Sequence, residues 1–485
     1  MESIMYRSLA IVVLFIFVSA PAVSQSLPEN AGAISGFNIY ETLDRLTSEE
    51  FQGRHTGHEG FNDAATWTAN LFEEWGLAPA GDDENYLLPF PVEYTLINDA
   101  SMSVHIVDEE QENGFREEEL EPETDFLPLL YSDTADRTAE VVFIGWGIHA
   151  PDIGYDDYFG VDVEGKFVMC FRGTPDPQDR RFQYHDEHRT RMQRAKDEGA
   201  LGLIYIYEEP IANPNGDWIE GFTPVKISYD VADKLLGERS IDTATLRQDL
   251  LKYKRPISFP LKSQVRIQVE STHYPDATGY NVAGFIEGSD PDLRDEVIVV
   301  GAPLDHCGTH MGLLFAGADD NASGSSVVLE IARAFAENDI RHGRSVMFAL
   351  FGGEEMGLIG SRYLVDNFPE RFTSIANMIN FDMVGAGDGA FCGYSADHDD
   401  LKELVEKTDT HIGTVQSFFP IRDIGVRGSD HAPFHAQGIP VLYFVSNGPH
   451  IKYHTTGDTI YRMNPGVMED IARIGYLTAI ELSNK

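Results

Sequence analysis

The chain has few cysteines and few positive charges, and its apolar stretches are short. Its three cysteines, Cys170, Cys307 and Cys392, are scattered over 485 residues, so we expect no disulfide framework. Lysine and arginine number 36 against 79 aspartates and glutamates, which gives a formal net charge of −43. This excess of negative charge argues against nucleic acid and anionic membrane surfaces as partners. No apolar run beyond the N-terminus is long enough to predict a membrane span.

Residues 1–24 are predicted to be a secretory signal peptide. Arg7 gives a small positive region, 9–18 form an apolar core, and Ala22-Val23-Ser24 offers small residues for cleavage. The apolar core is too short to cross a membrane, although an N-terminal membrane anchor is the alternative interpretation. We therefore expect a secreted or periplasmic protein.

The length of the chain predicts more than one domain, because 485 residues exceed what one hydrophobic core usually serves. Residues 25–134 are expected to be the N-terminal helical part of the main domain, since apolar residues recur at helical spacing between Ile39 and Leu77. Residues 135–265 contain short β-runs such as 166–171 and 201–206, and are expected to be an inserted β-rich module. Residues 266–485 form the expected catalytic domain.

The C-terminal segment predicts an α/β fold. Continuous apolar runs at 297–301, 345–351, 377–381 and 441–445 read as buried strands, and 327–336 reads as a helix between two of them. Alternation of strand and helix predicts parallel βαβ units. Strands that are apolar throughout predict a mixed, mainly parallel sheet covered by helices on both faces.

Acidic residues follow three of these predicted strands. Asp305 comes after the first, the pair Glu354-Glu355 after the second, and Asp382 after the third. In open α/β sheets, ligands bind beyond the carboxyl ends of the strands, so these side chains are expected to converge. Asp320 and His454 lie in polar turns of the same segment. Carboxylates and imidazole together are the donor set of catalytic zinc sites.

Seven motifs follow one another in this part of the chain: GAPLDH at 301–306, GADDNASG at 317–324, FGGEEMGLIGS at 351–361, NFDMVG at 380–385, SDHAPF at 429–434, GIPVLYF at 438–444 and YHTTGDT at 453–459. Through them the chain resembles metallopeptidase family 28, the co-catalytic zinc aminopeptidases. The segment 135–265 resembles a protease-associated (PA) domain through 154–158, 165–166 and 199–200. The resemblance implies a zinc-exopeptidase-type fold with an inserted PA domain.

The resemblance also implies the metal ligands. Asp320 would bridge two zinc ions, Glu355 and His454 would complete one site, and Asp382 would belong to the other. Two adjacent metals would clamp the attacking water and polarise the scissile carbonyl.

Four further residues match other roles in the family. Glu354 would be the general base and acid, and Tyr453 would either hold the developing oxyanion or serve as an aromatic packing residue. Asp305 and Asp458 match positions that orient the ligands.

The chain departs from the family pattern at Pro303, where the pattern has a histidine ligand for the site that contains Asp382. Two carboxylates alone would make a weak zinc site. His306 and His310 lie close by in the sequence and are possible substitute ligands. The chain is therefore expected to bind either two zinc ions or one.

Three functions remain open on this basis. The first is a secreted zinc exopeptidase, most simply an aminopeptidase that removes N-terminal residues from peptides by metal-activated water. The second is a single-zinc enzyme of the glutaminyl-cyclase type, which resembles this fold and uses the three-ligand set retained here. The third is a catalytically impaired, peptidase-like binding protein, which Pro303 would favour. The oligomeric state is left open.

Overall fold

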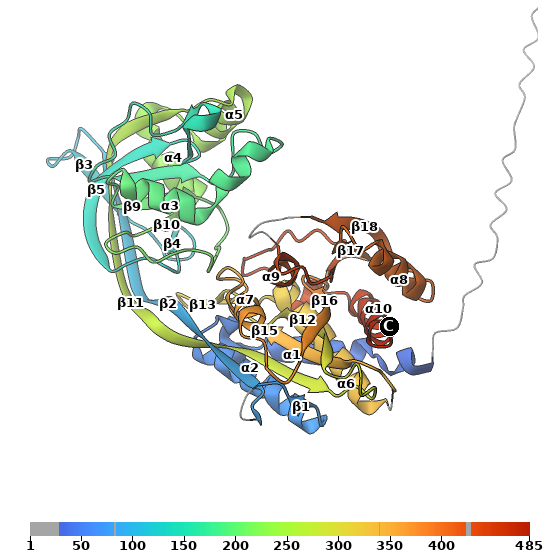
Figure 1. Ribbon diagram of the computed structural model, residues 1–485. Helices are drawn as coiled ribbons and strands as arrows, with labels where there is room; N and C mark the ends of the chain where they lie inside the picture. Colours follow the sequence, from blue (N-terminus) through green and yellow to red (C-terminus); the bar gives the residue numbers. More distant parts are fainter. Residues whose placement is uncertain (1–28, 82–83, 339, 423–427) are drawn as a thin grey trace, which may run out of the picture.

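The computed structural model describes residues 29–485 apart from 82–83, 339 and 423–427, so the predicted signal peptide lies outside the described residues. Figure 1 shows two lobes joined by the long paired strands β2 (Leu87–Val107) and β11 (Ser258–Ile286). Register shifts interrupt this pairing at 270–271 and 274–277, as β-bulges do where a strand bends. Within the described residues, one 15-stranded sheet runs through both lobes.

The C-terminal lobe is built on the strand order β18-β17-β19-β16-β12-β15-β11. The pairs β12–β15, β12–β16, β16–β19 and β17–β18 are parallel, whereas β17–β19 and β11–β15 are antiparallel. The predicted mixed, mainly parallel sheet is therefore confirmed. Its strands not yet bounded are β12 (Glu296–Pro303), β15 (Ser345–Phe351), β16 (Ser374–Phe381), β17 (Ala390–Ser395), β18 (Val415–Ile421) and β19 (Val441–Ser446).

Helices cover both faces of this sheet, as the apolar strands predicted. Alternate residues of β15 point to opposite faces: Val346 and Phe348 join one apolar core, and Met347 and Ala349 join another. The first core is closed by α1 (Gly36–Leu46), α2 (Glu59–Glu74), α6 (Gly324–Glu337), α8 (Asp399–Asp409) and α10 (Pro465–Ser483). The second core is covered by α7 (Ile359–Asp366) and α9 (His431–Ala436).

The N-terminal segment is helical only as far as Glu74. Residues 87–134, which were grouped with the helical part, form β2, β3 (Phe115–Glu119), β4 (Phe126–Pro128) and the loops between them. In β2 the buried residues Ala100, Met102 and Val104 are two positions apart, which is the period of a strand.

The inserted lobe has its own apolar cores and the strand order β5-β8-β9-β10-β4. The strands predicted at 166–171 and 201–206 correspond to β8 (Phe167–Phe171) and β9 (Gly202–Ile206). The lobe also contains β5 (Ala135–Ile144), β10 (Val225–Ile227), α3 (His188–Asp197), α4 (Tyr229–Leu236) and α5 (Thr243–Tyr253). Short elements of the same lobe are β6 (His149–Ala150), η4 (Pro151–Ile153), β7 (Tyr155–Asp156), η5 (Arg180–Asp186) and η6 (Gly237–Arg239). Short elements elsewhere are η1 (Glu29–Ala33), η2 (Glu49–Arg54), β1 (Ala78–Pro79), β13 (Gly308–His310), β14 (Leu313–Phe315), η7 (Ala318–Ser323) and η8 (Ile460–Arg462).

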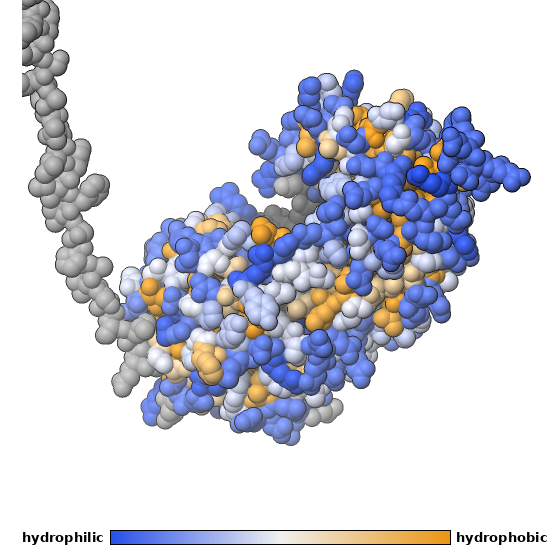
Figure 2. Space-filling model, turned by 180° about the vertical axis from the view of Figure 1, so that it is seen from behind, coloured by the Kyte–Doolittle hydropathy of each residue, from blue (hydrophilic) through white to orange (hydrophobic). Residues whose placement is uncertain are grey.

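The surface is polar over most of the face drawn in Figure 2, in keeping with a mean hydropathy of −0.24. No helix among the described residues is long and apolar enough to cross a membrane. All three cysteines are free and buried, so the prediction of a fold without a disulfide framework is confirmed.

Asp157 is a buried carboxyl group in the inserted lobe. Its Oδ2 accepts hydrogen bonds from the backbone N–H of Trp146 (3.1 Å) and Ile148 (3.0 Å), and its Oδ1 accepts one from the Tyr155 hydroxyl (3.0 Å). Burial raises the pKa of Asp157 to about 7, although these hydrogen bonds act to lower it.

This shift predicts a pH-dependent contribution to stability. Because the folded protein holds the Asp157 proton more tightly than the unfolded chain, the stabilisation is fully present below the unfolded pKa of about 4 and is lost as the pH rises to about 7. We expect Asp157→Asn to remove this dependence. The difference in Tm, variant minus wild type, should increase between pH 4 and pH 7.5 in thermal unfolding experiments. A difference that stays constant would contradict the assignment.

Candidate metal centre

The predicted site residues lie at one edge of the C-terminal sheet. The parallel strands β15, β12, β16 and β19 all end there. Asp305, Glu355 and Asp382 follow β12, β15 and β16, respectively. Asp320 lies in η7, immediately before α6, and His454 lies in the loop beyond β19. The convergence expected from the positions of the strand ends is thus present in the fold.

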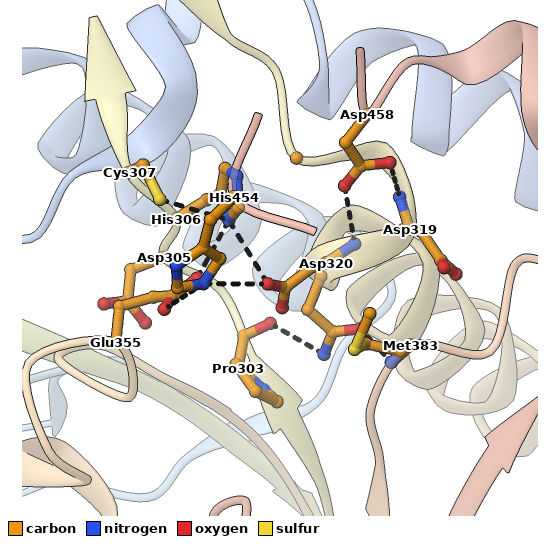
Figure 3. A network of polar contacts seen from close by, with 12 residues as sticks. Pro303, Asp305, His306, Cys307, Asp319, Asp320, Glu355, Met383, His454 and Asp458 are labelled. Carbon is orange, nitrogen blue, oxygen red and sulfur yellow. Dashed lines mark hydrogen bonds and ion pairs between the residues drawn. The ribbon is translucent and has the colours of Figure 1, made fainter. Parts of the chain in front are cut away.

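Three side chains meet at the centre of the site, where Figure 3 shows them. His454 Nε2 lies 2.8 Å from Glu355 Oε2 and 3.2 Å from Asp320 Oδ2. All three side chains are almost completely buried. Two carboxylate oxygens and one imidazole nitrogen therefore point into one small space.

His306 joins this group from the end of β12. Its Nδ1 lies 2.9 Å from Glu355 Oε1 and 3.7 Å from Asp320 Oδ2. It was predicted as a possible substitute ligand on the side of Asp382, but its ring lies against Glu355. His310 is not part of the site, because its Nε2 contacts the carbonyl oxygen of Pro128 at 2.6 Å. The structure therefore does not bring His310 together with the other predicted ligands; sequence spacing alone did not show where its ring would point.

Two further carboxylates hold the backbone of the central residues. Asp458 accepts hydrogen bonds from the backbone N–H of Asp319 (2.9 Å) and Asp320 (3.0 Å). Asp305 Oδ1 accepts one from the N–H of Glu354 (3.1 Å). Asp458 and Asp305 therefore hold the backbone of the segments that carry Asp320 and Glu354-Glu355.

Arg54 lies buried behind the centre. Its guanidinium donates to the carbonyl oxygens of Leu304 (2.9 Å), Leu46 (2.6 Å), Ala316 (2.9 Å) and Gly317 (2.9 Å). Burial lowers the pKa of Arg54 to about 10, against the opposing effect of nearby carboxylates, so the group stays charged at neutral pH. One cation thus joins the loop after β12 to the turn before η7.

The charge of the centre is unbalanced. Burial and mutual repulsion raise the pKa values of Asp320, Glu354, Asp382 and Asp430. Burial alone would lower the pKa of His454, but the adjacent carboxylates raise it to about 10.

These groups suit a bound cation. Asp382 Oδ1 is buried and has no hydrogen-bond partner among the described residues. A buried, unpaired carboxylate oxygen is costly unless it binds a proton or a metal. Asp320, Glu355 and His454 could hold one metal ion, and their oxygen and nitrogen donors are those that zinc uses at catalytic sites.

Asp430 was missed as a site residue by the sequence analysis. It immediately precedes α9, is completely buried, and interacts electrostatically with Asp305, Asp382 and Glu355. The motif SDHAPF was recognised, but no strand precedes it in the way that strands precede the other acids. The signal available in the sequence was the position of the Asp430 carboxylate, directly after Ser429 and directly before a helical segment with apolar residues.

The inserted lobe contacts the loop that carries His454. Ile211 forms an antiparallel bridge with Thr455, and the N–H of Ala212 donates to the carbonyl oxygen of His454 (3.1 Å). Cys307 Sγ donates to the carbonyl oxygen of Ala212 (3.4 Å); this thiol is buried, and burial raises its pKa well above the usual value. The inserted lobe is therefore in direct contact with the backbone of the candidate metal ligand.

A cavity of about 100 Å³ lies beside the centre and is lined by residues that include Met383, Ile451 and Tyr453. The Tyr453 ring is half-exposed and stacks on His454, with 3.7 Å between ring centroids. At the wall of the cavity, His450 Nδ1 pairs with Asp319 Oδ2 at 2.5 Å. Asp458, which holds the backbone of Asp320, also lines this cavity, whereas Asp320, Glu355 and His454 do not.

The segment that carries these residues also matches a known protein family. Residues 281–478 match the family model of peptidase family M28, so the resemblance to metallopeptidase family 28 is confirmed for this segment. Leupeptin-inactivating enzyme 1 of Streptomyces exfoliatus is 34% identical over 177 residues, which are 36% of this chain and 38% of that protein. Aminopeptidase YwaD of Bacillus subtilis is 26% identical over 326 residues, which are 65% of this chain and 62% of that protein. The chain thus spans less than two thirds of these relatives.

Solved structures share the fold over nearly the whole chain. A peptidase M28 precursor from Shewanella amazonensis aligns with a TM-score of 0.70 and 18% identity, covering 94% of this chain and 96% of that one. The zinc aminopeptidase BSAP from Bacillus subtilis aligns with a TM-score of 0.65 and 20% identity, covering 95% and 97%. At this level of identity the likeness shows the fold alone.

Replacement of the buried guanidinium tests its structural role. Arg54→Lys keeps the charge but cannot reach four carbonyl oxygens, so buried acceptors lose their partners. We expect the free energy of unfolding to fall by about 3 kcal/mol, as for other broken buried charge networks. Denaturant unfolding measures this change. Arg45→Lys, in an exposed ion pair with Glu50, is the matched control and should change stability little. Equal effects of the two substitutions would contradict the role of Arg54.

Proposed function

We propose that the protein is a zinc-dependent aminopeptidase that removes N-terminal residues from peptides. The convergence of His454 Nε2, Glu355 Oε2 and Asp320 Oδ2 next to the half-buried Glu354 carries this proposal. The family match and the zinc aminopeptidases among the related proteins support it. Zinc bound to these three donors would supply Lewis acidity to the reacting carbonyl group.

Glu354 is proposed as the general base and acid. It takes a proton from the attacking water, the water oxygen adds to the carbonyl carbon, and Glu354 returns the proton to the amine as the C–N bond breaks. Burial and repulsion from Asp382 raise the pKa of Glu354 well above its usual value, which suits a carboxyl group that both accepts and donates a proton. Tyr453 is proposed to face the carbonyl oxygen.

The centre is proposed to hold one metal ion firmly. The donors of the second site are reduced to Asp320 and Asp382, because Pro303 has no side-chain donor. The nitrogen donor of the centre, His454 Nε2, lies on the other side, beside Glu355. An all-carboxylate pair is a poor zinc site.

The remaining predictions are part of the same proposal. Residues 1–24 act as a signal peptide that directs the protein out of the cytoplasm. Residues 135–265 form an inserted protease-associated domain. Its contact with the His454 loop suggests that it helps to shape access to the site.

Hydrolysis of matched peptides tests the proposed activity. Wild-type protein with zinc should cleave peptides with a free N-terminus and leave N-acetylated copies intact. Glu354→Gln should lower kcat by about 10²–10⁴-fold while zinc content is unchanged, since the substitution removes only the proton acceptor. Zinc binding without hydrolysis of any peptide would overturn the aminopeptidase assignment. Full activity of Glu354→Gln would overturn the role of Glu354.

The number of metal ions tests the effect of Pro303. We expect elemental analysis of wild-type protein, dialysed against trace zinc, to find one zinc per chain. Pro303→His adds an imidazole next to Asp320 and Asp382 and should raise the content toward two. Pro303→Ala removes the proline without adding a donor and should stay at one. Two zinc ions in wild-type protein would mean that other residues complete the second site.

A further inference from the structure

His306 is held rigidly in the centre by its surroundings. Its side chain is completely buried, and its backbone N–H donates to the carbonyl oxygen of Arg54 at 3.1 Å. Gly317 makes room for the imidazole, since a Cβ at this glycine would lie 2.4 Å from His306 Cγ. The φ angle of Gly317 is +59°, which side chains other than glycine rarely adopt. The absence of a side chain at Gly317 therefore leaves space for the His306 ring.

The two oxygens of Glu355 have different partners. Oε1 lies 2.9 Å from His306 Nδ1, whereas Oε2 lies 2.8 Å from His454 Nε2 and faces the centre. An ionised carboxylate oxygen can only accept a hydrogen bond, so His306 Nδ1 must carry the proton. A protonated Nδ1 has no lone pair to offer a metal ion; the lone pair of this tautomer is on Nε2, which is buried and has no hydrogen-bond partner among the described residues.

We propose that His306 is a positioning residue, whose Nδ1–H holds Glu355 Oε1 so that Oε2 alone joins Asp320 and His454 as a metal ligand. The inference rests on the proposed zinc site but concerns a residue that the family pattern does not use as a ligand. Ligands that are themselves hydrogen-bonded are fixed in orientation, and loss of such a partner typically costs 10–100-fold in metal affinity.

The arrangement has a consequence for the open position of the centre. A glutamate free to rotate can bind a metal through both oxygens and so occupy a place that water needs. With Oε1 held by His306, Glu355 is limited to one oxygen. This restraint matters more in this chain, because Pro303 removes an imidazole from the neighbouring site and leaves the metal to three protein donors.

Three substitutions of His306 test whether the Nδ1–H donor itself is required, or only the bulk or the other atoms of the imidazole. Asn places an amide N–H close to the position of the imidazole Nδ1–H and should preserve the contact. Leu removes the donor, and Gln carries its amide farther along the side chain, at the distance of Nε2. His310→Leu is the matched control, since His310 is another buried histidine, at the end of β13, and contacts Pro128 outside the centre.

Zinc affinity of the full chain, stripped of metal and titrated against a chelating dye, is the main readout. We expect His306→Leu and His306→Gln to weaken zinc binding by about 10–100-fold. His306→Asn and His310→Leu should stay within about threefold of wild type. Near-ultraviolet circular dichroism of the metal-free proteins checks folding, and Gln replaces Leu in the comparison should Leu fail to fold.

Cobalt(II) absorption gives a second readout that does not depend on turnover. The intensity of the visible bands falls as the coordination number rises. We expect weaker bands in His306→Leu, where Glu355 can bind through both oxygens, and wild-type bands in His306→Asn. Unchanged affinity in Leu and Gln would overturn the proposal. Equal losses in Asn and Leu would also overturn it, because the imidazole itself would then be required.

The outcomes separate this proposal from that of aminopeptidase activity. Zinc binding that depends on the His306 donor, without hydrolysis of any peptide, would remove the activity and leave the positioning role. Normal hydrolysis with unchanged zinc affinity in His306→Leu would remove the positioning role and leave the activity.

Discussion

Burial of many carboxyl groups at one sheet edge is the constraint on which the rest of the structure depends. Such a group is stable only where cations, donors or protons compensate it. Arg54 supplies one fixed cation, and its four backbone contacts also tie together the loops that carry His306 and Asp320. Backbone N–H groups pair with both oxygens of Asp458 and with Oδ1 of Asp305. The negative charge of the remaining carboxylates is uncompensated, and a divalent cation at the centre would balance it.

The same constraint explains why the inserted lobe touches the centre. The loop after β19 must leave the sheet to bring His454 back over Glu355, and His454 has a φ of 57°, in the left-handed region. Such backbone is costly for a residue other than glycine and persists where its surroundings hold it. Ala212 and Ile211 do so through the backbone. Lys452 of the same loop pairs with Glu209 at 2.6 Å. The inserted lobe is therefore part of the framework of the site.

Sequence patterns predicted the parts of this fold that depend on local order. The strands β12, β15 and β19 are mainly apolar, and β16 ends in a largely apolar run, so they could be recognised. The rule that ligands bind beyond parallel strand ends then predicted that Glu355 and Asp382 lie close together. Features set by distant contacts could not be predicted. The carbonyl partners of Arg54 lie up to 263 residues away along the chain. The different directions of His306 and His310 are set by their partners, Glu355 and the carbonyl oxygen of Pro128, which sequence spacing does not show.

Pro303 changes the centre without disturbing its framework. Its carbonyl oxygen still accepts from the Ser325 hydroxyl at 2.6 Å, an interaction available to any residue at this position. The carboxylates that orient Asp320 and Glu354 keep their backbone partners. A scaffold without catalytic or metal-binding demand would have no physical need to keep buried acids that repel one another. The buried acids that repel one another are present, although Pro303 supplies no side-chain donor. A changed metal content explains both observations better than loss of the metal altogether.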